Sequence, residues 1–244
     1  MGVYDRHAVW YDDIYDAVGH DAVAEVDTIR TLLDERGVAS RSLLDVACGT
    51  GRHAEAFRHH VPEVAGVDLS DAMLEVARQR LPGCELVRAD FRSFDLGRTF
   101  DVVTCLFSAI GHVADEDELR QAVAAMAAHV APGGLLVIET WLTPELVDPA
   151  GRRDAVTVPV DDGYVARLGR SVVDGDVLVV EFAWAVVTPG SAEVEIETHR
   201  MPLFTEAQYR AAVASAGLDA EWIAPGPLST GRPLLLGRRS PAGA

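Results

Sequence analysis

The sequence predicts an α/β protein whose doubly wound, mainly parallel sheet carries an antiparallel β insertion after the fifth strand. Three observations predict this class. Over the first two-thirds of the 244 residues, short apolar runs alternate with segments in which apolar residues recur at helical spacing. The apolar runs are nearly continuous, as expected of strands that are buried on both faces of a parallel sheet. After Pro144 the helical pattern stops, and strand-like segments separated by turn residues replace it.

The parallel part is built from five strands and the helices that precede or connect them. Ser70 is placed to cap one helix, and Asp115 with Glu118 forms a capping-box pattern ahead of another. The run 132–134, Pro-Gly-Gly, is expected to end that second helix, because proline and glycine interrupt helical structure. The predicted strands are 42–47, 64–68, 85–90, 100–107 and 135–139, and the predicted helices are 20–35, 52–60, 71–80 and 116–130.

The segment after the fifth strand is predicted to form the antiparallel insertion. Two turn signals, Asp-Gly-Asp and Pro-Gly-Ser, separate three segments of β character. In the third segment, three glutamates alternate with Val194, Ile196 and Thr198, which predicts a sheet with one wet face. The predicted strands are 165–172, 177–187 and 193–199.

After the insertion the chain is predicted to return to the main sheet. Thr205 and Gln208 form a second capping box, and Phe204 with Tyr209 can form a hydrophobic staple. The helix ends at Gly217, and two last strands complete a sheet of seven. These strands lie near 219–224 and 233–237, so residues 1–144 and 202–244 are predicted to form one domain and residues 145–201 the insertion.

Composition limits the possible partners. The chain has 21 basic residues, all of them Arg, against 38 acidic residues, and its net charge is −17. Such a surface repels polyanions, so a nucleic-acid binder is not expected, although a few Arg side chains could hold a small anion. No apolar run reaches the roughly 18 residues of a membrane span, and residues 1–13 lack the pattern of a signal peptide. A cytoplasmic protein with reduced cysteines and no metal centre is therefore predicted.

The motif that carries the chemistry joins the first parallel strand to the next helix. It reads Asp-Val-Ala-Cys-Gly-Thr-Gly over residues 45–51, and such a glycine turn lets the backbone approach a ligand closely. Residues 49–54 also fit G-x-G-x-x-A, the fingerprint of dinucleotide-binding proteins, in which Asp68 would hold ribose hydroxyls as well. Asp45 separates the two interpretations. A carboxylate so close to the turn would repel a pyrophosphate but would suit the ammonium group of a methionine tail.

These features resemble those of Rossmann-like S-adenosylmethionine-dependent methyltransferases. The resemblance covers most of residues 40–140, and four elements in the expected order carry it. It implies a seven-stranded sheet of the methyltransferase type with S-adenosylmethionine as cofactor. The four elements are Leu43–Gly51, Asp68 after the second strand, Arg88–Phe91 after the third, and Phe100–Val103 into the fourth.

The resemblance also implies roles for the matching residues. Asp45 would lie near the amino group of the cofactor, and Asp68 would accept hydrogen bonds from both ribose hydroxyls. Asp90 would accept from the adenine amino group, and the Phe91 backbone amide would face the ring. Apolar or backbone contacts with the methionine and sulfonium would come from Ala47, Gly49, Gly51 and Leu106.

A narrower resemblance extends over nearly the whole chain. The sequence is similar to bacterial methyltransferases that dimethylate the amine of dTDP-linked deoxyamino sugars, of the desosamine and mycaminose type, in macrolide antibiotic pathways. Those enzymes also carry an antiparallel insertion after the fifth strand, and some are thought to dimerise. The matching segments are 42–51, 78–82, 98–100, 106–112, 199–205 and 231–232.

This second resemblance implies the acceptor side of the site. His112 would be the catalytic residue, because histidine titrates near neutrality and this one would face the amino sugar. Tyr11 would contact the methionine carboxylate, and Tyr4 or Trp10 would help to close the site. Trp141 would wall the sugar pocket. The diphosphate would be held by Arg167 and Arg232, whose forked guanidinium groups match phosphate oxygens.

We therefore predict an N-methyltransferase for a nucleotide-linked amino sugar, with a homodimer as a possible assembly. Two alternatives remain open: O- or N-methylation of another small metabolite, and a non-catalytic module that binds S-adenosylmethionine or a nucleotide. An NAD-dependent dehydrogenase is a more distant possibility. Each site residue also has a structural interpretation, in which His112 caps a loop, Tyr11 and Trp141 pack in the core, and both arginines pair with the acidic surface.

Overall fold

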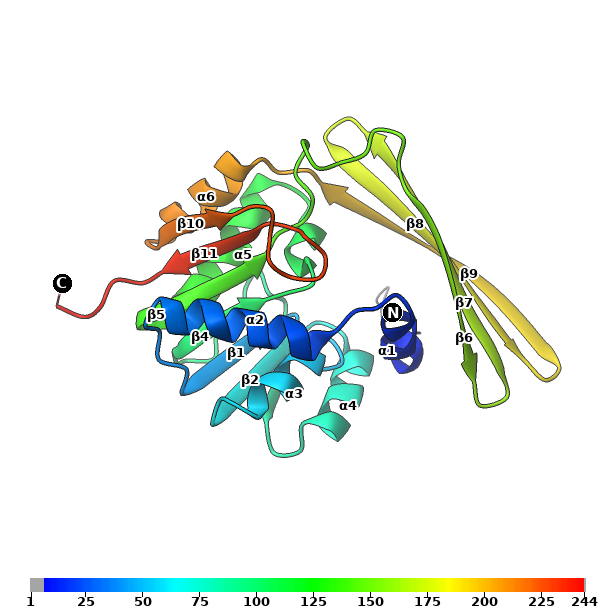
Figure 1. Cartoon of the computed structure of the whole chain (residues 1–244), viewed down its shortest axis with the longest axis horizontal. Coiled ribbons are helices and arrows are strands. Elements are labelled where there is room, and N and C mark those ends of the chain that lie inside the picture. The colour runs from blue at the N-terminus through cyan, green and yellow to red at the C-terminus, as the bar shows by residue number, and fades with distance from the viewer. Residues whose placement is uncertain (1–6, 244) are drawn as a thin grey trace.

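The computed structural model describes residues 7–243, which form a seven-stranded sheet between helices and a separate four-stranded sheet (Figure 1). The strand order of the large sheet is β10-β11-β5-β4-β1-β2-β3. Its strands are β1 (Ser42–Val46), β2 (Glu63–Asp68), β3 (Glu85–Arg88), β4 (Phe100–Cys105), β5 (Val130–Glu139), β10 (Asp219–Ile223) and β11 (Leu234–Arg238). The helices are α1 (Ala8–Ala17), α2 (Ala22–Glu35), α3 (Arg52–Arg58), α4 (Asp71–Arg80), the 3-10 helix η1 (Ala109–His112), α5 (Glu116–Ala128) and α6 (Glu206–Ser215).

The predicted fold class is confirmed. Strands β1 to β5 pair in parallel, whereas β11 pairs antiparallel with both β5 and β10. The strand order runs one way from β1 to β3 and the other way from β4 to β5. Ligands of open α/β sheets bind at the carboxyl ends of the strands beside such a reversal. The topology therefore places the expected site after β1 and β4.

The core has two layers, one on each face of the sheet. Leu43 and Val102 pack with α2 and α3, whereas their neighbours Leu44 and Val103 pack with α5 and α6. All four side chains are fully buried. Successive side chains of a strand point to opposite faces, so a nearly continuous apolar run can serve both layers.

One predicted boundary is wrong. Helix α5 ends at Ala128, and β5 begins at Val130, so the Pro-Gly-Gly run lies inside the strand rather than before it. The pairing of β4 with β5 shifts register there, between the partners of Phe100 and Val102. A side chain at Gly134 would place a Cβ 2.7 Å from the Asp101 carbonyl oxygen. Gly134 therefore permits an irregular pairing between β4 and β5. Glycine often ends a helix, but here it allows a strand to approach its neighbour closely.

The insertion is a four-stranded antiparallel sheet in the order β6-β7-β8-β9. Its first strand was missing from the sequence prediction. The strands are β6 (Arg153–Val160), β7 (Gly163–Asp174), β8 (Val177–Thr188) and β9 (Ser191–Pro202). Helix α1 lies against this sheet, with Ile14 packed among Val156, Val165 and Trp184 (Figure 1).

The sheet alternates as predicted, but the glutamates do not all face solvent. Glu197 is only 9% exposed and accepts a hydrogen bond of 3.0 Å from the Trp184 indole nitrogen. The apolar partners in the pattern, Val194 and Ile196, are each 71% exposed. The expectation of a wet glutamate face is therefore wrong at Glu197, and an apolar face points outward instead.

No helix among residues 7–243 is both long enough and apolar enough to cross a membrane. Cys48, Cys84 and Cys105 are free thiols. The division of the chain into residues 1–144 with 202–244 and residues 145–201 stays a prediction.

Candidate active site

The turn between β1 and α3 follows a left-handed path. The φ angles are +57° at Ala47, +55° at Gly49 and +80° at Gly51. Ala47 has a Cβ, so its conformation costs about 1–2 kcal/mol that a glycine would avoid. At Gly51 an added Cβ would also lie 2.8 Å from the Leu81 Cδ1 atom. The motif therefore curls at the end of β1 and brings α3 close to α4.

Asp45 lies at the base of this turn and is 2% exposed. The Thr104 hydroxyl on β4 donates a hydrogen bond of 2.7 Å to its carboxylate. Burial raises the pKa of Asp45 to about 6, although His53 opposes the rise. A buried carboxylate with one hydroxyl partner is well suited to pair with a ligand cation.

Asp68 ends β2 and is fixed by two backbone amides. Gly49 donates to one carboxylate oxygen and Ser70 to the other, each at 2.8 Å. The two amides orient the Asp68 carboxylate at the end of β2, and a carboxylate only accepts hydrogen bonds. Ser70 also caps α4 as predicted, by accepting from the Met73 amide.

Asp90 has a strong partner inside the protein. Arg92 donates to both carboxylate oxygens, at 2.9 and 2.6 Å, and lowers the pKa of Asp90. The same guanidinium reaches Glu118 at 2.7 Å. Phe91 packs partly buried against the core. An adenine amino group would share the Asp90 oxygens with Arg92, so this role stays a prediction.

A pocket opens beside the turn, and we call it the glycine-loop pocket. It brings together five residues that the sequence singled out and several that it did not. Gly51, Asp68, Asp90 and Phe91 do not line it, although Asp68 binds Gly49 at its edge. Its lining consists of Tyr11, His20, Asp45, Ala47, Cys48, Gly49, Thr50, Arg52, His53, Leu106 and Phe107.

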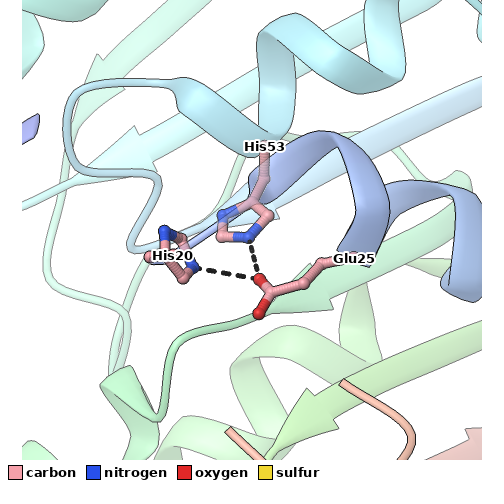
Figure 2. Close-up of side chains that lie close together, drawn as sticks. All are labelled: His20, Glu25 and His53. Carbon is pink, nitrogen blue, oxygen red and sulfur yellow. Dashed lines mark hydrogen bonds and ion pairs between the residues drawn. The ribbon is translucent and has the colours of Figure 1, made fainter. Parts of the chain in front are cut away.

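Two histidines of this pocket share one carboxylate (Figure 2). Glu25 Oε2 accepts from His20 Nε2 at 3.0 Å and from His53 Nε2 at 2.8 Å. Burial favours the neutral acid, but the hydrogen bonds from His20, His53 and Ser229 outweigh it and hold the pKa of Glu25 well below its ordinary value. The three ligand atoms lie within 4.8 Å of one another, close enough for a metal ion to bridge them. The short N–O contacts are hydrogen bonds, and no spacing in the sequence indicated this group.

A second group surrounds η1, and we call it the η1 cluster: Ser108, His112, Trp141, His199 and Arg232. The His112 ring touches solvent, yet burial by the surrounding protein and the nearby His199 lower its pKa to about 4. The two rings are 5.4 Å apart at their centroids. His112 is therefore neutral at pH 7 and can accept a hydrogen bond.

Trp141 and Arg232 stack within the η1 cluster. The guanidinium carbon lies 4.6 Å from the centre of the indole ring, and its Nη1 donates to the Ser108 hydroxyl at 2.9 Å. Burial lowers the pKa of Arg232 while Glu139 opposes the shift, so the side chain remains a cation. The Trp141 indole nitrogen is buried with no hydrogen-bond partner among the described residues.

Arg167 approaches from β7 and is 6% exposed. Its guanidinium lies over the rings of Tyr15, at 5.0 Å, and Phe182, at 4.6 Å, and it pairs with Asp154 at 3.1 Å. Its Nε is buried and has no partner within the described part of the chain. Of the remaining predicted residues, Trp10 packs beside the insertion sheet, and Tyr4 lies outside the described residues.

Comparison with known proteins decides the family. Residues 43–134 match the model of a methyltransferase domain. A dTDP-3-amino-3,4,6-trideoxy-alpha-D-glucopyranose N,N-dimethyltransferase from Streptomyces venezuelae is 40% identical over 95% of this chain and 97% of its own length. The chain belongs to the S-adenosylmethionine-dependent methyltransferases. A dTDP-4-amino-2,3,4,6-tetradeoxy-D-glucose N,N-dimethyltransferase from Saccharopolyspora spinosa is 39% identical over 96% of this chain and 93% of its own length.

Solved structures agree with this family. An S-adenosylmethionine-bound amino pentose methyltransferase from Micromonospora echinaspora is 38% identical, covers 94% of this chain and 96% of its own, and superposes with a TM-score of 0.84. The crystal structure of Streptomyces venezuelae DesVI is 40% identical, covers 96% of this chain and 98% of its own, and gives 0.88. The methyltransferase therefore uses S-adenosylmethionine, as the residues of the glycine loop predicted.

The methyltransferase site contains residues that sequence reasoning missed. His20 and Arg52 line the glycine-loop pocket, and Ser108 and Glu139 support Arg232. Glu139 is fully buried and accepts from the Phe107 amide at 2.6 Å. A glutamate at the end of an apolar strand was a usable signal, because a buried carboxylate needs partners. Nothing local marks the histidine pair, since its members meet only in the folded protein.

Proposed function

We propose that this methyltransferase moves methyl groups from S-adenosylmethionine to the amino nitrogen of a dTDP-linked deoxyamino sugar in antibiotic biosynthesis. Similarity over the full length carries this proposal. Three relatives, from Streptomyces venezuelae, Saccharopolyspora spinosa and Streptomyces fradiae, are 39–40% identical over at least 93% of this chain. All three are named as N,N-dimethyltransferases of dTDP-amino sugars. The similarity includes the insertion, where a substrate-specific surface would lie.

The cofactor half of the site is assigned to the glycine-loop pocket and its edge. Asp45 faces the ammonium group of the methionine part, and Asp68 holds the ribose. Ala47, Gly49 and Gly51 curve the backbone beneath the ligand, Leu106 lies near the sulfonium, and Tyr11 lies near the carboxylate. Asp90 and Phe91 are assigned to adenine. The bound cofactor supplies an electrophilic methyl group, so the protein needs only to align and desolvate the reactants.

The acceptor half is assigned to the η1 cluster and to Arg167. The sugar nitrogen attacks with its lone pair, so it must be a neutral amine, and a desolvated site favours that form. As the N–C bond forms, the C–S bond breaks and its electron pair stays on sulfur. His112 accepts an N–H hydrogen bond that orients the lone pair, and the proton then passes to solvent. Trp141 walls the sugar, while Arg167 and Arg232 bind the diphosphate.

Incubation of the enzyme with S-adenosylmethionine and a panel of dTDP sugars tests this proposal. The panel includes a 3-amino sugar, a 4-amino sugar and dTDP-glucose, which has no amine. Mass spectrometry should detect one or two added methyl groups on an amino sugar and none on dTDP-glucose. Absence of transfer to every amine would overturn the acceptor assignment, and methylation of dTDP-glucose would favour the O-methyltransferase alternative.

We also propose that two copies of the chain pair through the outer face of the insertion sheet. Its exposed apolar residues are Tyr164, Leu168, Val187, Val194 and Ile196, which are 47–71% exposed. Contiguous apolar patches of this kind mark interaction surfaces. A second copy with the same apolar face can cover it through a two-fold axis.

A further inference from the structure

We propose that His20 receives the carboxylate of the cofactor's methionine part and that Glu25 holds the imidazole in place for this task. The inference rests on the assignment of the glycine-loop pocket to the cofactor. It adds a cation to the methionine site, for which the sequence indicated Asp45 and Tyr11 as the polar side chains. His20 would act as an imidazolium bridge between two carboxylates, one from the protein and one from the ligand.

Glu25 fixes the orientation of the His20 ring (Figure 2). The Glu25 side chain is 1% exposed, and its Oε2 accepts hydrogen bonds from the Nε2 atoms of both histidines. Ser229 donates its hydroxyl to Oε1, so the carboxylate cannot turn without losing a partner. Because a carboxylate only accepts hydrogen bonds, His20 Nε2 must carry its proton toward Glu25. The remaining ring nitrogen, Nδ1, lies on the other side of the imidazole.

His20 Nδ1 makes no hydrogen bond to another described residue, although the side chain is only 7% exposed. The residue lines the same pocket as Asp45. Its ring lies 4.3 Å from that of Phe107, and Arg52 donates to its backbone carbonyl at 3.4 Å. With its proton on Nε2, the neutral ring offers Nδ1 only as an acceptor, and a second proton on the ring would make Nδ1 a donor to a ligand carboxylate.

The charges of the pocket indicate that the cofactor's carboxylate needs a cationic hydrogen-bond donor. A methionine tail carries an ammonium and a carboxylate, and Asp45 can match only the first. Asp45 and Glu25 would both repel the second. Arg52 is the other cation in the lining, and Asp16 engages one of its nitrogens. A second proton on His20 places a charge-assisted donor opposite the ligand carboxylate, and hydrogen bonds of this kind are the stronger ones.

Several other charged groups surround His20, so the test compares variants and ligands at a single pH. The titratable and charged groups that share a pocket, a hydrogen bond or a ring contact with His20 are Tyr11, Asp12, Tyr15 and Asp16 of α1, Asp21 and Glu25 at α2, Asp45 of β1, Cys48 of the turn, Arg52, His53 and Glu55 of α3, and Arg80 of α4.

The decisive experiment pairs a variant with an altered ligand. Calorimetry should show that His20→Gln raises the Kd for S-adenosylmethionine about 10- to 100-fold. Decarboxylated S-adenosylmethionine lacks the group that His20 receives, so its Kd should change less than about threefold with the same variant. His59→Gln, an exposed histidine at the end of α3, is the matched control and should change neither Kd. An equal loss for both ligands would overturn the proposal.

A second variant keeps the proposal testable if His20→Gln fails to fold. His20→Lys keeps a cation at this position, so at pH 7 it should bind S-adenosylmethionine about 10-fold more tightly than decarboxylated S-adenosylmethionine. Equal Kd values for the two ligands would contradict the bridge. Binding that requires added Zn²⁺ and disappears with EDTA would instead favour a metal site on the same three residues. If the wild type binds no S-adenosylmethionine at all, the cofactor assignment itself fails.

Discussion

At the residue scale, the buried carboxylates of the candidate site differ, because burial raises the pKa of Asp45 whereas hydrogen bonds lower that of Glu25. Asp45 was identified from sequence because its position before a glycine turn is itself a signal. His20 and His53 were missed, because their significance arises from contact between α2, α3 and the loop before α2, and no spacing encodes such contact. Asp90 shows a third outcome, since its position matched the expectation while Arg92 engages both of its oxygens.

Asp45→Asn should weaken the cofactor and stabilise the fold. Losing the charge should raise the Kd for S-adenosylmethionine about 10- to 100-fold. The folded state raises the pKa of Asp45 from 3.8 to about 6, so the ionised carboxylate costs stability above that range and the cost disappears as pH falls through it. At pH 7.5 the variant should gain about 1–3 kcal/mol in free energy of unfolding. Urea titration measures the change in free energy of unfolding, and calorimetry measures the change in Kd. A destabilised variant with unchanged Kd would contradict the assignment.

His112→Ala should lower kcat about 10- to 100-fold while the Kd for S-adenosylmethionine stays within about twofold. The expected cause is loss of the group that orients the acceptor amine. Because the pKa of His112 is about 4, its titration should not contribute to the wild-type kcat profile between pH 6 and 8. Steady-state kinetics against a dTDP-amino sugar measure this. Unchanged kcat in the variant would leave His112 as a loop residue only.

At the element scale, periodicity located the parallel strands well, and turn chemistry located their boundaries less well. Ser70 and Thr205 cap the helices that they were expected to cap. The start of β5 was misplaced because Pro-Gly-Gly can end a helix or permit an irregular strand, and the choice depends on the neighbouring β4. Strand β6 was missed because its central apolar residues, Val156 and Val158, are few and gain their meaning from α1 packing on them.

Gly51→Ala and Gly83→Ala form a matched pair for the glycine turn. Both positions have strongly positive φ, +80° and +83°, but only Gly51 has atoms close to the added Cβ. Each variant should lose about 1–2 kcal/mol from the backbone conformation. Gly51→Ala should lose about 1–3 kcal/mol more by pushing against Leu81, and it should also weaken cofactor binding. Equal unfolding free energies in urea would show that the contact with α4 is not restrictive.

At the scale of the whole molecule, alternation in a sheet predicts two unlike faces but not which of them meets solvent. The insertion followed the predicted alternation, while Glu197 turned inward and Ile196 outward. The sequence could not show which face of the sheet is buried, because that depends on what packs against each face. Here α1 and the η1 cluster supply polar partners to the inner face. In the dimer that we propose, a second copy of the chain would cover the outer face.

Ile196→Arg should separate the proposed dimer. The side chain is 71% exposed in the single chain, so the substitution should leave the unfolding free energy of the monomer nearly unchanged. Light scattering should give the mass of two chains for the wild type and of one for the variant. Asp162→Asn changes the net charge by the same one unit in the exposed turn between β6 and β7, and it serves as the control. A wild-type protein with the mass of a single chain would contradict the proposed dimer.

Helix α1 has contacts on both sides of the enzyme. Its Tyr11 lines the glycine-loop pocket, Asp12 binds Thr50 at 2.7 Å and Arg80 at 2.6 Å, and Tyr15 lies under Arg167 of the insertion. Helix α1 therefore borders both the proposed cofactor pocket and the proposed acceptor site. Two successive methylations require the demethylated cofactor to leave between them. A movement of α1 that releases the cofactor would also release the sugar. We therefore expect a distributive enzyme, in which singly methylated sugar accumulates in solution before the doubly methylated product, as a time course with excess acceptor would reveal.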